Sequence, residues 1–473
     1  MTPIHKKNSK TNYENYRPIS LLSVVSKIYE KLIYVRIYNY LTVNNFIFSK
    51  QFGFRSNFSA NHAIISLTEK IKSLMDQDYV VCGIFLDLEK AFDTVNHNIL
   101  CDKLNFYGLR GNINNLIKSY LTNRKQYVSI NGKDSEVRDI TCGVPQGSSL
   151  GPLLFLIYIN DFRFCLDQTE SGHFADDTYL LYASKKMKTI EVVINTELKL
   201  VSNWLKLNRL SLNETKTELI FFRSKRRILD RNVIIKLNGK KLRPVNHVKY
   251  LGIYIDRNLS WDFHIIELSK KLSRANGILS KLRHNAPREV CLNVYYALFY
   301  SHLIYGINVW GLTTEENLKK IETLQNKCVR ILTFSDFDAH ANPLYLSLKI
   351  LKLHDIITLS HIKLVYEFTK NSLPFDLQNL FKLSKDNVTS TMTLNSIRNN
   401  YLVIPHVNHD YSGTKSLKFQ CPSTWNEFMK NIASKKIMLS TAPNSYLDFN
   451  KILNIYQLKR KLKTHFLYLY ASE

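Results

Sequence analysis

Hydrophobic residues recur at helical spacing over two long stretches near the start of the chain. Residues 21–41 place apolar side chains three or four positions apart, and residues 57–76 repeat the pattern. Such spacing gathers the apolar side chains on one face of an α-helix. The period then changes, because residues 79–86 form a short run of β-branched and aromatic side chains. That run predicts a buried strand, which ends at Asp87.

Further short strands follow, separated by helices and turns. The predicted strands are residues 126–130, 136–141, 173–175, 178–182, 219–223, 233–237 and 250–255. Helical patterns cover residues 99–124 and 191–205, and an apolar helix begins near Pro152. The dipeptide Asn131-Gly132 predicts a tight hairpin between the first two strands. Only Asp176 and Asp177 separate the next two strands, which places both aspartates at the tip of a second hairpin.

The second half of the chain reads mainly as helix. Helical patterns continue from residue 261 to about residue 370, residues 371–450 are less periodic, and a basic helix closes the chain. Residues 290–314 carry no formal charge, but their tyrosine, asparagine and histidine side chains are too polar for a bilayer core. We expect a buried helix pair there and no association with a membrane. The whole pattern predicts an α+β protein.

Charge points to a polyanionic partner. Lys and Arg number 65 against 39 for Asp and Glu, a net charge of +26, with a sequence pI near 9.6. Basic runs at residues 5–7, 223–227 and 459–461 could each follow a phosphate backbone. A soluble protein from a lysine-rich proteome would show the same bias, so charge alone does not decide. The seven cysteines form no CxxC pair, which gives no zinc finger and suits a reducing compartment.

Three aspartates carry the most informative chemistry. Asp87 ends an apolar strand, and Asp176 and Asp177 form the predicted hairpin tip. Buried carboxylates that come together repel one another, and a hard divalent cation relieves that repulsion. Ligands that offer only oxygen favour Mg²⁺, with Mn²⁺ as an alternative. Two such ions can serve phosphoryl transfer. The alternative is that each aspartate only caps a turn.

Several short strings, in a fixed order, resemble one family. Residues 85–93, 143–152 and 174–177 read FLDLEKAFD, GVPQGSSLGP and FADD. These strings are similar to motifs A, B and C of the reverse transcriptases of non-LTR (LINE-like) retrotransposons. Residues 15–22 (NYRPISLL) and 51–55 (QFGFR) resemble the two finger motifs of that family. Residues 210–218 (LSLNETKTE) resemble its motif D, and residues 248–252 (VKYLG) resemble its primer grip.

The resemblance implies a metal site and a residue that selects deoxyribonucleotides over ribonucleotides. Asp87, Asp176 and Asp177 match the metal-binding triad, and the main-chain carbonyl of Leu88 falls where the family supplies a further ligand. Phe92 lies five residues after Asp87. An aromatic ring at this position would exclude a 2′-hydroxyl and so select dNTPs. Taken without the family, Phe92 could be an ordinary core residue.

Other positions match the nucleotide and primer sites. Gln146 and Gly147 match the nucleotide-binding loop, where a glycine lets the backbone approach the base. Arg55 matches the finger arginine that grips the triphosphate, which a planar guanidinium suits. Lys216 matches the lysine proposed to protonate pyrophosphate. The primer grip corresponds to the consecutive residues Tyr250, Leu251 and Gly252.

The resemblance implies a right-hand polymerase fold and its partners. We expect fingers in residues 1–80, a palm with an antiparallel sheet in residues 81–260, a helical thumb in residues 261–340, and a mostly helical C-terminal region of unknown role in residues 341–473. The implied partners are an RNA template, a DNA primer and dNTPs. Residues 413–417 and 422–426 resemble the C-terminal region of jockey- or RTE-like elements. Oligomeric state and localisation stay open, with the nucleus as one option.

Alternatives to an RNA-directed DNA polymerase follow from the same residues. The retrotransposons that the motifs resemble usually carry an upstream endonuclease domain and an N-terminal extension that contacts RNA. The sequence shows no such domain, and few residues precede the first finger motif, so we expect a truncated copy. Such a copy could be a silent relic that binds nucleic acid without copying it. An RNA-templated RNA polymerase is a second alternative, which Phe92 opposes. A hydrolytic metal nuclease is a third, which would leave motif B and the finger motifs without a purpose.

Overall fold

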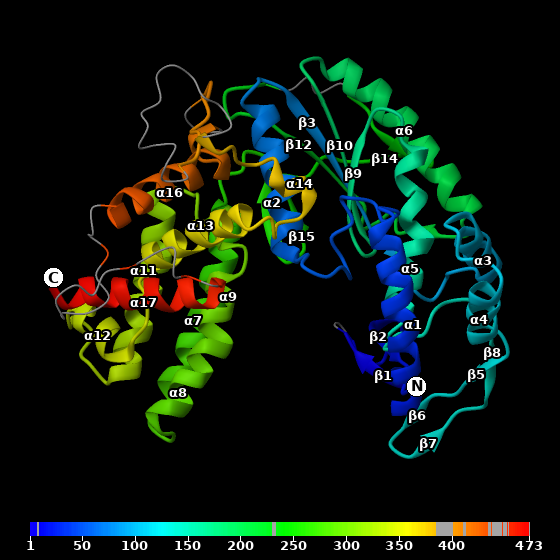
Figure 1. Cartoon of the computed structure of the whole chain (residues 1–473), viewed down its shortest axis with the longest axis horizontal. Coiled ribbons are helices and arrows are strands. Elements are labelled where there is room, and N and C mark those ends of the chain that lie inside the picture. The colour runs from blue at the N-terminus through cyan, green and yellow to red at the C-terminus, as the bar shows by residue number, and fades with distance from the viewer. Residues whose placement is uncertain are drawn as a thin grey trace. The chain divides into compact units, whose positions relative to one another are not determined.

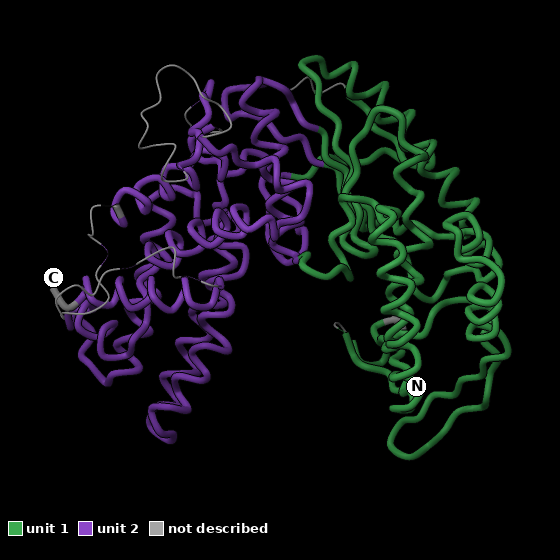
Figure 2. Tube along the Cα trace, viewed as in Figure 1, with its two compact units in different colours: residues 1–58, 82–219, 229–245 green, residues 59–81, 220–228, 246–473 purple. Residues whose placement is uncertain are grey.

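A computed structural model of the chain describes most of its residues. The described residues are 1–6, 9–228, 233–384, 401–409, 413–433, 437, 447, 452 and 454–472. They form two compact units, each assembled from segments that are distant in the sequence (Figure 2). Unit 1 comprises Met1–Phe58, Cys82–Leu219 and Leu229–Val245, and unit 2 comprises Ser59–Val81, Ile220–Ile228 and Asn246–Glu473.

The sheet that carries the predicted catalytic strands has four members. Its strand order is β12 (Glu218–Phe222), β3 (Val80–Leu86), β10 (Asp177–Ser184) and β9 (Glu170–Phe174) (Figure 1). Every residue of β3 is buried, as expected for a continuous apolar run. β9 and β10 pair antiparallel as a hairpin. β3 and β10 are therefore neighbouring strands of this sheet.

Unit 1 contains β9, β10 and most of β3, together with helices and two-stranded ribbons. Its other elements are β1 (Thr2–His5), η1 (Tyr13–Asn15), β2 (Tyr16–Ile19), α1 (Val24–Val43), β4 (Leu88–Glu89), α3 (His97–Phe106), α4 (Asn112–Leu121), β5 (Arg124–Gln126), β6 (Ser129–Ile130), β7 (Lys133–Asp134), β8 (Arg138–Ile140), α5 (Gly151–Ile159), η2 (Asn160–Cys165), α6 (Met187–Leu207), β11 (Ser211–Leu212), β13 (Lys236–Leu237) and β14 (Lys240–Lys241). α5 is apolar on all sides and almost wholly buried, so it forms the centre of this unit's core.

Unit 2 is mostly helical. Its elements are α2 (Ala60–Met75), β15 (His247–Tyr250), β16 (Ile253–Asp256), α7 (Asp262–Leu282), α8 (Arg288–Val294), the π-helix η3 (Tyr295–Tyr300), α9 (Ser301–Ile304), α10 (Ile307–Trp310), α11 (Glu315–Thr333), α12 (Ala341–Leu348), α13 (Leu353–Thr369), α14 (Phe375–Gln378), α16 (Leu417–Ala433) and α17 (Ile455–Ser472). α7 packs against α11, and α13 packs against α16 and α17. The described helices include none with the length and apolar character that a bilayer span requires.

The predicted α+β class is confirmed, and most predicted elements are present. Helices α1, α2, α6 and α7 to α13 cover the regions where helical spacing was found, and α17 is the predicted closing helix. Asn131 and Gly132 have φ of 51° and 77°, as a tight hairpin with two left-handed residues requires. Several predictions are wrong. The strand predicted over residues 126–130 is split between the end of β5 and β6, and only Lys236–Leu237 of residues 233–237 form a strand. Residues 99–124 form two helices, because Gly108 and Gly111 take positive φ between them. Residues 250–255 are not one strand but the last residue of β15, the turn and most of β16 in the β15–β16 hairpin.

The apolar spacing of α1 does not mark its buried face. The buried residues of this helix are Glu30, Ile33, Ile37 and Leu41. The exposed apolar side chains of residues 21–35 include Leu21, Val24, Val25, Ile28, Leu32 and Val35. The helix is therefore present where the pattern predicts it, while its contact with the core is made by a different stripe that includes a carboxylate.

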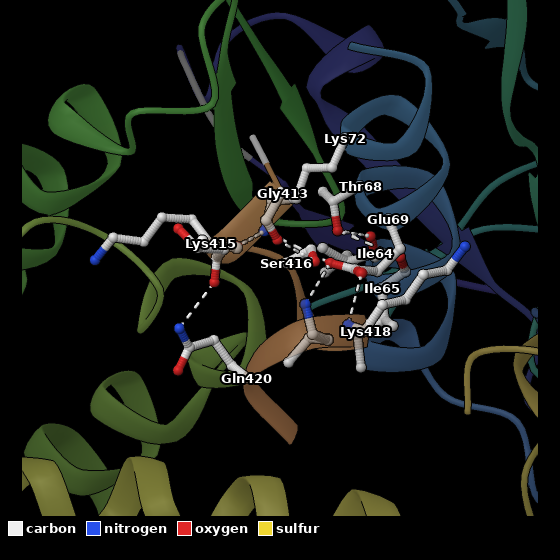
Figure 3. A network of polar contacts seen from close by, with 12 residues as sticks. Ile64, Ile65, Thr68, Glu69, Lys72, Gly413, Lys415, Ser416, Lys418 and Gln420 are labelled. Atoms are coloured by element: carbon white, nitrogen blue, oxygen red, sulfur yellow. Dashed lines mark hydrogen bonds and ion pairs between the residues drawn. The ribbon is translucent and has the colours of Figure 1, made fainter. Parts of the chain in front are cut away.

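A buried ion pair joins α2 to the start of α16 within unit 2 (Figure 3). Glu69 and Lys72 are 2% and 3% exposed, and their charged atoms lie 3.5 Å apart. Glu69 accepts the backbone N–H groups of Leu417 and Lys418 at 3.0 and 3.2 Å. Lys72 Nζ donates to the carbonyl of Lys415 at 2.7 Å. The segment around residues 413–418 is thus bound to α2 through charged side chains that the core encloses.

Candidate active site

The β9–β10 hairpin positions two of the predicted catalytic aspartates. Asp177 pairs with Phe174, so the two connecting residues are Ala175 and Asp176, and Ala175 has φ of 58°. The prediction that Asp176 and Asp177 form the tip is therefore wrong by one residue, because Asp177 already belongs to β10. Asp176 lies in the turn and is half-buried, whereas Asp177 is exposed.

Asp87 lies between β3 and β4, at the end of the strand next to β10. Its main-chain carbonyl accepts the N–H of Asn213 at 2.8 Å, and β4 pairs antiparallel with β11. Directly opposite residues in such a ladder alternate between pairs that exchange hydrogen bonds and pairs that do not. Leu88, one residue on, is opposite Leu212 in the non-bonded position. Its carbonyl is therefore directed away from β11 and can serve as a ligand.

The charges of the neighbouring aspartates contribute to raised pKa values at Asp176 and Asp177. Burial, and then the charge of Asp87, raise the pKa of Asp176 above its ordinary value. Burial, and then the charges of Asp176 and Asp87, raise the pKa of Asp177 to about 6. Mutual repulsion of this kind shows that the strand order brings together the three side chains that the sequence selects. A positive charge placed among them would lower their energy.

Basic side chains flank this cluster. Lys216 Nζ lies 3.2 Å from Asp87 Oδ2, so the predicted motif D lysine is next to the triad. Lys6, which follows β1, lowers the pKa values of both Asp176 and Asp177. Arg17, on β2, lowers the pKa of Asp176. The role of Arg17 beside the carboxylates was not foreseen; its only sequence signal is its place within the first finger motif. The next residue of the first basic run, Lys7, lies outside the described residues.

The donor set fits a divalent cation that also takes ligands from a substrate. Among the described residues, no group of three or more His, Cys, Asp or Glu side chains is arranged as a ready metal cage. Mg²⁺ commonly binds through one or two carboxylates together with water and phosphate oxygens. Asp87, Asp176 and the carbonyl of Leu88 offer oxygen atoms only, which suits that mode of binding.

Hydrogen bonds join the second finger motif, residues 51–55, to the turn between β9 and β10, which is called the catalytic turn below. Gln51 Oε1 accepts the N–H of Gly53 at 2.9 Å and that of Ala175 at 3.0 Å. The N–H of Phe52 donates to the carbonyl of His173 at 2.8 Å. A Cβ atom on Gly53 would lie 2.3 Å from the nitrogen of Ala175, so only glycine allows this approach. These contacts join residues 51–53, which directly precede Phe54 and Arg55, to the turn that contains Asp176.

Arg55 is half-buried and well ordered by its neighbours. Its guanidinium stacks on Phe58, 3.9 Å from the ring centroid, and donates to the carbonyls of Phe48 and Gln51 at 3.0 and 3.2 Å. Nε has no hydrogen-bond partner among the described residues. Burial lowers the pKa of Arg55. The fork is thus oriented by carbonyls and an aromatic face, with donor capacity left for an anion.

The motif B loop is fixed from three sides. The carbonyl of Gln146 accepts the N–H of Ser20 at 2.8 Å, and its side-chain amide donates to Asp93 at 2.9 Å. Gly147 has φ of 99°, and a Cβ there would lie 3.2 Å from the carbonyl of Ser20. Glycine is therefore favoured at residue 147 mainly by this backbone conformation, and a Cβ would also be tightly packed.

Glu30 supplies the third constraint and was not predicted. Its carboxylate is 2% exposed and accepts the N–H groups of Ser149 and Leu150 at 2.6 and 3.4 Å. The phenol of Tyr120 donates to its other oxygen at 3.0 Å. A buried carboxylate at the start of α5 is stabilised by these donors and by the helix dipole. Its sequence signal is weak, because Glu30 looks like one more polar position of a helix.

Phe92 contacts two other aromatic rings. Its ring stacks on Phe155 of α5, with centroids 4.5 Å apart and planes at 25°. Phe54 meets it edge-on, with centroids 6.0 Å apart and planes at 86°. Phe92 is half-buried, so part of its ring still reaches solvent. The ring is thus held in one place beside the loop that follows Asp87.

The predicted primer grip is a tight turn in unit 2. Leu251 and Gly252 connect β15 to β16 with φ of 46° and 82°. Tyr250 is 3% exposed. The phenol of Tyr305 donates to the carbonyl of Leu251 at 2.6 Å, which fixes the turn from outside the hairpin. Leu251 in the left-handed region explains why this segment does not form the continuous strand that the sequence predicts.

A family model described as reverse transcriptase (RNA-dependent DNA polymerase) matches residues 4–255, more than half of the chain. The chain belongs to the reverse transcriptase family. Every site residue selected from the sequence, from Arg55 to Gly252, lies within the matched segment. Reverse transcriptases use divalent metal ions, act on an RNA template and share the right-hand polymerase fold, so the predicted fold is confirmed.

Relatives come from mobile elements of flies. The chain is 30% identical over 351 residues to the probable RNA-directed DNA polymerase from transposon X-element of Drosophila melanogaster, covering 72% of this chain and 38% of that protein. It is 29% identical over 367 residues to the RNA-directed DNA polymerase from mobile element jockey of the same fly, covering 74% and 39%. The chain therefore spans about two fifths of the length of these relatives. The predicted kinship with retrotransposon reverse transcriptases is confirmed.

Among solved structures, the chain is similar to telomerase from Candida tropicalis. The TM-score is 0.38 with 12% sequence identity, and the match covers 70% of this chain and 54% of the telomerase chain.

Proposed function

We propose that this reverse transcriptase is the RNA-directed DNA polymerase of a non-LTR retrotransposon, which transfers nucleotides from dNTPs to the 3′-hydroxyl of a DNA primer. The observation that carries the proposal is the proximity of Asp87, Asp176 and Asp177, in which the charge of Asp87 raises the pKa values of both other carboxyls. The contact of Lys216 Nζ with Asp87 Oδ2, at 3.2 Å, adds support. The relatives' names state the same activity.

The proposed cofactor is a pair of Mg²⁺ ions, for which Mn²⁺ could substitute. Asp87, Asp176 and the carbonyl of Leu88 would hold them, with Asp177 as the least certain ligand because it is the most exposed of the three aspartates. Bound there, the two ions would activate the primer hydroxyl and stabilise the leaving pyrophosphate. The protein would contribute by holding these oxygen atoms on rigid strands at a fixed spacing.

The remaining residues bind and orient the substrates. Arg55 would grip the triphosphate through its free donor capacity. Gln146 and Gly147 would line the base and template side of the nucleotide. Lys216, an exposed ammonium beside Asp87, would give a proton to pyrophosphate. The turn at Leu251 would hold the primer end.

Phe92 would exclude the 2′-hydroxyl of a ribonucleotide. Its fixed ring offers no polar partner for a hydroxyl, so an extra oxygen would meet both a steric and a desolvation penalty. We assign the fingers, palm, thumb and C-terminal region to residues 1–80, 81–260, 261–340 and 341–473.

The test is primer extension by the full chain on an RNA template annealed to a DNA primer, with Mg²⁺ and dNTPs. The wild-type chain should extend the primer and Asp176→Ala should not. Asp102→Ala is the matched control, because Asp102 is an exposed carboxylate on α3. Extension that survives Asp176→Ala would overturn the site. A wild-type chain that binds the RNA in a salt-sensitive way but does not extend the primer would show a silent nucleic-acid-binding relic instead.

A further inference from the structure

We infer that Phe54 is a positioning residue for Phe92, so that discrimination between dNTPs and ribonucleotides depends on Phe54 as well as on Phe92. The inference rests on the proposed function, since it concerns sugar selection at the same site. Nothing in the chemistry of the three aspartates requires Phe54, so the inference can fail while the polymerase assignment stands.

The contacts of Phe92 leave one side chain that can be removed without damage to the core. Phe155, which stacks on one face of Phe92, is 0% exposed and belongs to the buried helix α5. Phe54 meets the ring edge-on and is 46% exposed. An edge-to-face contact of this kind opposes rotation of the partner ring. Together the two residues restrict Phe92 to a single orientation.

The backbone at Phe54 is unfavourable for a side chain. Its φ is 55°, in the left-handed region where a residue with a bulky side chain is rare. A large exposed apolar ring also gains little from burial. A side chain kept at a strained and exposed position is a reason to look for a function.

The cause of the strained conformation lies next to Phe54. Gly53 packs so closely on the catalytic turn that a Cβ would lie 2.3 Å from the nitrogen of Ala175. Gln51 bonds to the N–H groups of both Gly53 and Ala175. Residue 54 follows this close approach directly, and its ring meets that of Phe92 with the two planes at 86°. The position of this ring is tied to the same turn that holds Asp176.

The consequence is a gate made of three rings rather than one. Phe155 sets the depth of the Phe92 ring and Phe54 blocks its sideways movement. Without Phe54 the ring of Phe92 can turn aside and leave room for a 2′-hydroxyl. Selection against ribonucleotides should then weaken while the aspartates and the primer site stay as they are.

Phe54→Gly separates this role from a merely structural one, because glycine suits φ of 55° and removes the ring without strain. The readout is the ratio of kcat/KM for a dNTP to kcat/KM for the matching rNTP, in primer extension by the full chain. Phe54→Gly should lower this ratio by about tenfold, chiefly through better use of the rNTP. Phe54→Tyr should keep the wild-type ratio. Phe106→Ala, which removes a ring that is 78% exposed, is the control and should also keep it.

Phe92→Ala makes the outcomes distinguishable. The double variant Phe54→Gly/Phe92→Ala should show a ratio no lower than Phe92→Ala alone, because Phe54 acts only through Phe92. A wild-type ratio in Phe54→Gly, with a lowered ratio in Phe92→Ala, would overturn the inference and leave the proposed function intact. An unchanged ratio in Phe92→Ala would remove the gate itself, and the inference with it. A lowered KM for primer–template in Phe54→Gly, with no change in the ratio, would also count against it.

Discussion

The carboxylate of Glu69 accepts the backbone N–H of Leu417 at 3.0 Å, across 348 positions of sequence. Glu69 and Lys72 are both buried and bind backbone groups of residues 415–418. Residues 415–418 therefore have a structural role. They satisfy two charges that α2 carries into the core of unit 2 (Figure 3).

We predict that Glu69→Gln lowers the free energy of unfolding by about 3 kcal/mol, because it leaves Lys72 buried without an opposite charge. Chemical denaturation of the full chain measures this loss. Replacing both members, Glu69→Gln with Lys72→Met, should recover part of the loss, since the unpaired ammonium is then gone. Lys70→Met, on the exposed side of the same helix, should change stability by less than about 0.5 kcal/mol. A double variant weaker than Glu69→Gln alone would contradict this account of the pair.

We predict that, in buffer without divalent metal, the free energy of unfolding of the chain depends on pH through Asp177. Burial and the neighbouring aspartates raise the pKa of Asp177 from 3.8 to about 6 in the folded chain. The folded state then binds the proton more tightly than the unfolded state, so stability falls as the pH rises from about 4 to about 6. Asp177→Asn removes this loss. Because the side chain is surrounded by protein on one side but still reached by solvent, we expect a gain of only about 1 kcal/mol at pH 7.

Thermal unfolding at pH 4 and pH 7 checks this prediction. The melting temperature of Asp177→Asn should exceed that of the wild type at pH 7, and the difference should shrink at pH 4, where the wild-type carboxyl is protonated. Asp139→Asn is the control, since Asp139 is an exposed carboxylate on the β8 strand. A larger difference at pH 4 than at pH 7 would show that the direction of the Asp177 pKa shift is wrong.

Glu30 predicts an effect on nucleotide binding through the motif B loop. Glu30→Gln removes the charge that receives the N–H groups of Ser149 and Leu150, and the loss of one charged hydrogen bond costs about 2 kcal/mol. We expect KM for dNTPs to rise by about tenfold with a smaller change in KM for primer–template. Steady-state primer extension measures both constants. Tyr120→Phe removes only the third donor and should have a weaker effect in the same direction. Equal changes in the two constants would indicate general unfolding instead.

The catalytic strands were predictable from the sequence because local chemistry specifies them. A continuous apolar run gives a strand that is buried on both faces, as in β3, and two residues between apolar runs give a hairpin, as between β9 and β10. The position of the turn was not predictable to one residue. The string FADD allows more than one two-residue connection, and the pairing of Asp177 with Phe174 decides between them.

The supporting contacts of the site could not be predicted, because they join segments distant in the sequence. Glu30 reaches a loop 119 positions away, and Gln51 reaches Ala175 across 124 positions. The same is true of α1, whose exposed apolar stripe gives a stronger pattern than its buried one. Spacing indicates that a helix forms, whereas the choice of buried face depends on which partners the fold provides.

Tyr305 predicts a specific effect on primer binding. Tyr305→Phe removes the hydroxyl that donates to Leu251 at 2.6 Å but keeps the ring, which lies 3.5 Å from where a Cβ on Gly252 would be. The turn then loses a net hydrogen bond worth about 1 kcal/mol, and we expect KM for primer–template to rise about fivefold while KM for dNTPs and kcat stay within about twofold. Primer extension at varied primer–template concentration measures the change. Tyr296→Phe removes a phenol on the neighbouring π-helix and should leave both constants unchanged. A rise in KM for dNTPs alone in Tyr305→Phe would place this turn on the nucleotide side of the site and would remove the primer grip from residues 250–252.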